Sequence, residues 1–193
     1  MKIPKLLWLA LLLSSLAGCY PTTEVPINVP AGSRTAPEPY LGTWKLTEMF
    51  GRKPTGKAYM RIRRRGDQLK VLGAEKPIPE EADPGVNRKE EQDLILTRAK
   101  TKQIACLNHG GKKGWDVLEL ELKQGTLRVA GLDPDQVKRH IRAGVLRGRI
   151  EVLGRGTKEA EEQARITATG AELRSYIETR AVFVKLFEFE KVP

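Results

Sequence analysis

The sequence predicts a mainly β protein with two short helices, an α+β fold built on one antiparallel sheet, either open or closed into a barrel. Short apolar segments recur from residue 40 onward with turn residues between them, as in proteins made of many short strands. Several of these segments alternate apolar and polar residues, which is the period of a half-buried strand. Two stretches instead carry helix-start signals, and a length of 193 residues suits one domain.

The predicted strands follow from this alternation and from the turns between them. Residues 117–122 place three leucines on one face and Glu119 and Glu121 on the other. Arg65-Gly66-Asp67 predicts a hairpin turn, while an acidic loop is expected at 77–91 and a Gly-rich basic loop at 108–114. The predicted strands cover residues 42–49, 58–62, 68–72, 93–97, 103–107, 117–122, 127–129, 145–153, 165–168 and 181–192.

Two short helices are predicted from their capping residues. Asp133 precedes Pro134 at the first helical position, with Gln136 three residues after the cap. That helix is expected to end at Gly144. Thr169 and Glu172 form a second capping pattern, ahead of an apolar stripe of Leu173, Tyr176 and Ile177.

The N-terminus has the features of an export signal. Lys2 and Lys5 precede an apolar run at 6–13 that is too short to span a bilayer but suits a signal peptide. The run is followed by Leu16-Ala17-Gly18-Cys19, which resembles the lipobox of bacterial lipoproteins. The resemblance implies cleavage of residues 1–18, acylation of Cys19 and anchoring in the cell envelope. Because Tyr20 rather than Asp follows the cysteine, it implies the outer membrane, with the domain facing the periplasm.

A spacer is predicted between this anchor and the folded domain. Residues 19–39 hold five prolines among small and polar residues, a composition that favours an extended chain. The globular domain is then expected to cover residues 40–193. With Cys19 acylated, Cys106 is the remaining thiol, so no disulfide forms within the mature chain. The apolar neighbours of Cys106 predict a buried, inert thiol.

The start of the domain resembles a known family of barrels. Gly42-Thr43-Trp44 is similar to the Gly-x-Trp signature of lipocalins, and a late helix before a final strand is similar as well. The resemblance implies a closed barrel in which Trp44 closes one end of a cavity for a small hydrophobic ligand. The chain departs from that family because it has no Thr-Asp-Tyr turn, and because the helix at 134–143 has no lipocalin counterpart.

The residues that usually carry catalysis are sparse. The mature chain has two serines, Ser33 and Ser175, and two histidines, His109 and His140, with no Gly-x-Ser-x-Gly motif. Two histidines and one thiol cannot form a zinc-binding pattern. We therefore expect a protein that is not an enzyme and that needs neither a metal nor a cofactor.

Charge is the remaining functional signal. The chain has 34 Lys+Arg against 24 Asp+Glu, a net charge of +10 and a pI near 9.7. Residues 52–65 and 136–150 contain no acid. Within these stretches Arg61 and Arg63 share one strand face, as do Arg147 and Arg149, so these four arginines are the predicted binding residues.

The expected partner is anionic. Export separates the chain from nucleic acid, which leaves anionic lipid, lipid A phosphates or a cell-wall polymer. An envelope protein is an alternative partner, and the loop at 108–114 would serve an inhibitor of a periplasmic hydrolase. The sequence predicts no oligomeric state.

Overall fold

The computed structural model describes residues 20–30, 32–77, 91–108, 114–153 and 161–193. Its centre is a closed antiparallel barrel of eight strands. Neighbouring strands pair in the order β2-β3-β4-β5-β6-β7-β8-β11, and β11 pairs with β2 to close the ring. The barrel strands are β2 (Gly42–Met49), β3 (Tyr59–Arg65), β4 (Gln68–Ala74), β5 (Gln92–Ala99), β6 (Lys102–Asn108), β7 (Trp115–Lys123), β8 (Thr126–Leu132) and β11 (Phe183–Lys191).

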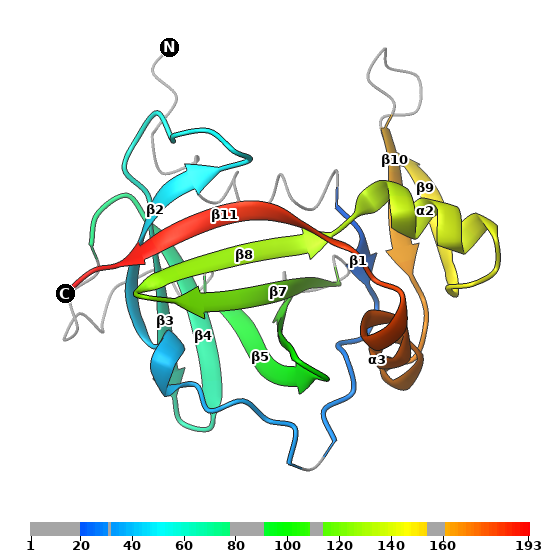
Figure 1. Ribbon diagram of the computed structural model, residues 1–193, viewed down its shortest axis with the longest axis horizontal. Coiled ribbons are helices and arrows are strands. Elements are labelled where there is room, and N and C mark those ends of the chain that lie inside the picture. The colour runs from blue at the N-terminus through cyan, green and yellow to red at the C-terminus, as the bar shows by residue number, and fades with distance from the viewer. Residues whose placement is uncertain (1–19, 31, 78–90, 109–113, 154–160) are drawn as a thin grey trace.

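A small sheet and two helices lie against one side of the barrel (Figure 1). In this sheet β1 (Thr22–Thr23) pairs parallel with β10 (Glu161–Ile166), which pairs antiparallel with β9 (Gly148–Leu153). The helices are α2 (Pro134–Arg142) and α3 (Gly170–Thr179), and a short 3-10 helix, η1 (Glu38–Tyr40), precedes β2. In the part of the chain that is described, no helix has both the length and the apolar character needed to cross a bilayer.

Two hydrophobic cores result from this arrangement. One lies inside the barrel, and the other lies between the outer face of the barrel and the appended sheet and helices. Strand β6 serves both, because Ala105 and Leu107 point inward whereas Ile104 and Cys106 point outward into the second core. This double role explains why residues 104–107 are apolar without alternation.

The local predictions for turns and caps are confirmed. The Asp133 carboxylate accepts hydrogen bonds from the backbone N–H groups of Asp135 and Gln136. Thr169 and Glu172 form a full capping box at the start of α3. Gly66 turns the chain between β3 and β4 with a φ of 57°, which glycine adopts without strain. The mainly β class with two helices is also confirmed, and the closed barrel agrees with the lipocalin resemblance.

Cys106 is buried, as predicted. Its thiol is fully shielded from solvent, and burial raises its pKa to about 12, which keeps it protonated at neutral pH.

The prediction of a free spacer at 19–39 is wrong for the residues that the structure describes. Thr22 and Thr23 are buried as β1 between β7 and β10, and Ile27 is 2% exposed within the second core. The Asn28 N–H donates to the Gly170 carbonyl oxygen at 3.0 Å. The prolines do not prevent this packing, because residues between them supply the N–H groups that reach neighbouring elements.

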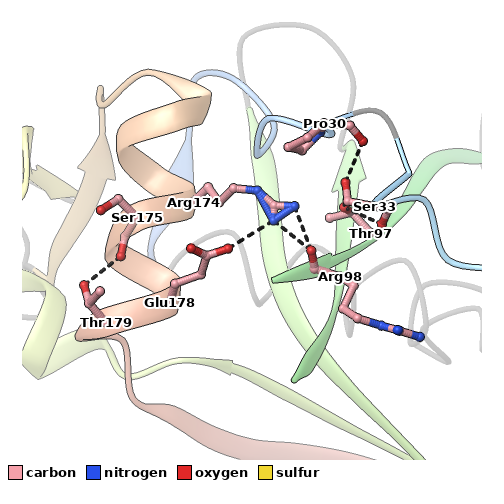
Figure 2. A network of polar contacts seen from close by, with 8 residues as sticks. All are labelled: Pro30, Ser33, Thr97, Arg98, Arg174, Ser175, Glu178 and Thr179. Atoms are coloured by element: carbon pink, nitrogen blue, oxygen red, sulfur yellow. Dashed lines mark hydrogen bonds and ion pairs between the residues drawn. The ribbon is translucent and has the colours of Figure 1, made fainter. Parts of the chain in front are cut away.

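The polar network in Figure 2 fastens the end of this segment to the barrel. The Ser33 hydroxyl donates to the Pro30 carbonyl oxygen at 2.8 Å, and the Thr97 hydroxyl of β5 donates to the Ser33 carbonyl oxygen at 3.1 Å. Arg174 of α3 reaches the same edge of β5, donating from both terminal nitrogens to the Arg98 carbonyl oxygen at 2.7 Å. Helix α3, strand β5 and the N-terminal segment are thus joined at one place.

If this segment belongs to the folded domain, Ile27→Ala should lower the free energy of unfolding by about 2–5 kcal/mol, the usual cost of emptying a buried Ile site. Val25→Ala is the matched control, because Val25 is 41% exposed and its truncation should cost less than about 0.5 kcal/mol. Urea unfolding followed by fluorescence measures both. Equal stability of the two variants would contradict the packed segment.

Candidate functional site

A small apolar cavity lies inside the barrel. Its volume is about 70 Å³, and every side chain on its wall is apolar, including Leu46, Ile62, Leu120 and Phe187. This is about half of the ~150 Å³ of an apolar cavity known to bind benzene and to stay free of water. The cavity has room for a small apolar molecule, whereas a lipid acyl chain needs the wall to move.

Trp44 occupies the end of the barrel where β2 begins. It is fully buried, two residues along the strand from the cavity-lining Leu46. Its indole N–H donates to the Tyr40 carbonyl oxygen at 2.8 Å, and the Lys191 ammonium lies 5.4 Å from the ring centre. The barrel is therefore filled at this end by an indole held in a fixed orientation.

The structure does not bring the four predicted arginines together. Arg61 and Arg63 lie on β3, whereas Arg147 and Arg149 lie at the start of β9, on the opposite side of the molecule (Figure 1). Arg61 is 7% exposed, and Arg63 pairs with Glu91.

The second pair of predicted arginines also has acidic partners. Arg147 pairs with Glu172 at 2.7 Å, and Arg149 pairs with Glu151 at 2.6 Å and Glu24 at 3.2 Å. Glu172 also accepts from the Thr169 N–H, which is the main reason that the pKa of its carboxyl is lowered. These arginines therefore have much of their charge compensated within the chain.

Charges on the outer face of the barrel compensate one another in the same way. Arg128 of β8 contacts Glu188 at 3.0 Å, and Lys185 contacts the same carboxylate at 3.0 Å. Hydrogen bonds from Lys185 and Arg128 lower the pKa of Glu188, which stays ionised. A neighbouring surface groove of about 670 Å³ is lined partly by these paired charges.

One group of cations differs from these ion-paired residues in its surroundings, and it lies on the loop between β2 and β3. This loop, residues 50–58, is called the basic loop below; it carries Arg52, Lys53 and Lys57, all exposed, and no acid. No carboxylate among the described residues forms an ion pair with any of the three. The acid-free stretch 52–65 includes these three cations, but the alternation of a strand singles out Arg61 and Arg63 instead, because a strand fixes which residues share a face.

An aromatic side chain begins the basic loop. Phe50 is 46% exposed, and its ring stacks on Tyr20 with 6.3 Å between centroids and lies 5.6 Å from Phe187. Phe50 and Gly51 have φ values of 50° and 76° inside a tight turn closed by hydrogen bonds between Met49 and Arg52. Such turns prefer Asn-Gly, and a left-handed conformation costs a bulky residue about 1–2 kcal/mol.

The described candidates for catalysis have structural contacts. His140 Nδ1 lies 3.0 Å from the Tyr176 hydroxyl, which joins α2 to α3, and burial raises the pKa of Tyr176 to about 12. Among the described residues, no group of three His, Cys, Asp or Glu side chains could hold a metal ion. His109 and most of the predicted 108–114 loop lie outside the described residues, as does most of the acidic loop at 77–91.

Comparison with known proteins found no matching family model, no similar curated protein and no similar solved structure.

The cavity makes a direct prediction. Leu120→Ala should enlarge it and lower the free energy of unfolding by about 2–5 kcal/mol. Benzene should then raise the Tm of this variant, because a larger dry cavity binds it in the folded state only. Glu121→Ala, on the outer face of the same strand, is the control and should show neither effect. A Leu120→Ala variant that does not respond to benzene would contradict an apolar cavity inside the barrel.

Proposed function

We propose that the protein is a non-enzymatic lipoprotein of the bacterial cell envelope, anchored in the outer membrane through acylated Cys19. Its barrel is a binding module for an anionic, phosphate-bearing component of that envelope. The observation that carries this proposal is the basic loop, on which Arg52, Lys53 and Lys57 are exposed without a carboxylate partner among the described residues.

Unpaired cations support an anion site better than paired ones do. Positive charges without nearby acids add to a field that extends into solvent, whereas the field of an ion pair largely cancels. Near an anionic membrane surface each Lys or Arg contributes about 1 kcal/mol. The three cations of the basic loop together contribute about 3 kcal/mol, which corresponds to an affinity change of about a hundredfold.

The paired arginines are weaker candidates for the same reason. Binding of a phosphate to Arg147 requires the contact with Glu172 to weaken, so part of the interaction energy is lost. The groups Arg61 and Arg63 on β3 and Arg147 and Arg149 at β9 are also too far apart to contact one small anion together (Figure 1).

A carrier of a small apolar molecule is a second candidate, and the apolar cavity of about 70 Å³ favours it. The volume limits the cargo to a few non-hydrogen atoms unless the barrel opens. This candidate requires a small apolar molecule that raises the Tm of the native chain and of Glu121→Ala alike, because the outer-face substitution leaves the cavity unchanged.

The test of the anion site uses the chain exported without a lipobox, so that it begins at Tyr20 and retains all the described strands and helices. Vesicles of phosphatidylglycerol mixed with phosphatidylcholine are the probe. Arg52→Gln, Lys53→Gln and Lys57→Gln combined should lower vesicle affinity by about a hundredfold at low salt. Thermal stability should not change, because these side chains make no described ion pair.

The matched control removes the same charge elsewhere. Lys100→Gln, Lys123→Gln and Arg180→Gln replace three exposed cations outside the basic loop and should leave vesicle affinity within a few-fold of the native value. Equal loss in both triple variants would show that net charge alone decides binding. If vesicle affinity fell only when Arg61, Arg63, Arg147 and Arg149 were replaced by Gln, the anion site would instead lie at these strand arginines.

A further inference from the structure

We propose that the surface around Tyr20 and the basic loop rests directly on the bilayer that holds the lipid anchor, with Phe50 inserted among the lipid headgroups. This surface, called the anchor face, consists of Tyr20, Phe50, Arg52, Lys53 and Lys57. The inference rests on the proposed function, since it requires that Cys19 is acylated. Beyond that function, the inference specifies which face of the barrel contacts the membrane and which side chain enters the headgroup region.

The first support is the distance available between lipid and fold. Cys19 is bonded to Tyr20, and consecutive Cα atoms lie about 3.8 Å apart. Tyr20 is fixed to the domain, because its carbonyl oxygen accepts from Gln163 Nε2 at 3.3 Å and its ring stacks on Phe50. Two residues later the chain enters β1 between β7 and β10. An acyl group on Cys19 is therefore attached within one residue of a rigid surface.

An extended spacer of about 20 residues would have allowed the domain to stand up to about 70 Å from the bilayer in any orientation. The packed segment removes that freedom. The side of the barrel that carries Tyr20 must face the membrane, and the basic loop lies on this side (Figure 1).

The chemistry of the anchor face fits a bilayer interface. Among the described side chains that are large, apolar and exposed, Phe50 is the one aromatic; the others are Val25, Val145, Val152, Leu153 and Val182. It begins a loop with three exposed cations. An aromatic ring that enters the headgroup region beside cations that contact lipid phosphates is the usual arrangement of an interfacial segment.

The backbone at Phe50 gives independent support. Its φ of 50° and the following Gly51 define a turn in which asparagine is preferred and a bulky aromatic is unfavourable. About half of the ring is exposed, so packing within the fold uses only part of it. A strained position that presents an apolar ring to solvent is better explained by contact with another surface than by the stability of the barrel.

The test uses the acylated protein reconstituted in vesicles of phosphatidylglycerol and phosphatidylcholine with brominated acyl chains, which quench nearby indoles. Phe50→Trp should be quenched several-fold more than Thr101→Trp. Thr101 is exposed in the turn between β5 and β6, which antiparallel pairing places at the opposite end of the barrel. The two native tryptophans, Trp44 and Trp115, give the same background in both variants.

The outcomes separate the two proposals. If the mass of the mature chain shows no acyl group on Cys19, the proposed lipid anchor is wrong, whatever the fluorescence shows. An acylated, membrane-bound chain in which the two introduced indoles are quenched equally, or not at all, would overturn the anchor face while leaving the lipoprotein intact.

A second experiment tests the ring itself. In the acylated chain carrying the reporter Thr55→Trp, which lies in the basic loop, Phe50→Asn should reduce quenching several-fold because the loop no longer inserts. The Tm should shift by less than about 5 °C, because the turn gains its preferred residue as the partly buried ring is lost. Unchanged quenching, or a Tm far below that of the parent chain, would identify Phe50 as a packing residue and overturn its insertion.

Discussion

The sharing of strand β7 among three neighbours is the constraint on which both cores depend. Along one edge β7 pairs with β6, and along the other it pairs first with β1 and then with β8. Strand β8 ends at Leu132, so Trp115 and Asp116 would present unpaired backbone groups next to a hydrophobic core. The two residues of β1 fill that place, because buried N–H and C=O groups must find partners. One short pairing thus fixes the N-terminal segment, the appended sheet and the second core.

The same pairing changes how an envelope anchor would act. An acyl group on a flexible spacer is a tether that sets a distance from the membrane, whereas an acyl group beside β1 also sets an orientation. Orientation matters for a weak surface contact, because a face held at the bilayer meets lipid at a high effective concentration. Three cations and one aromatic ring bind a bilayer only weakly when the protein is free in solution. The same side chains suffice to hold the anchor face on the bilayer once the covalent anchor has brought it there.

Whether a cation of the sheet has its charge compensated depends on which residue the neighbouring strand places beside it. Arg128 of β8 contacts Glu188 of β11, and Lys185 of β11 contacts Glu48 of β2, so each charge is compensated by a glutamate of the neighbouring strand. The basic loop lies beyond the paired residues of β2 and β3, and apart from the bridge between Arg52 and Met49 its residues are not paired with a strand. Exposure without a partner, more than the number of cations in a stretch, separates a candidate binding surface from a set of structural ion pairs.

Interactions between residues close in the chain could be predicted from the sequence: the caps at Asp133 and Thr169, the turn at Gly66, the alternation in residues 117–122 and the burial of Cys106. Each depends on backbone geometry or on the side chains of a few neighbours. Closure of the barrel, the packing of residues 20–39 and the pairing of the predicted arginines could not be decided in this way. Glu24 meets Arg149 and Ile27 meets α3 only after segments more than a hundred residues apart have folded together. The alternation of a strand fixes its two faces, but the opposing residue is chosen by the register and order of the whole sheet.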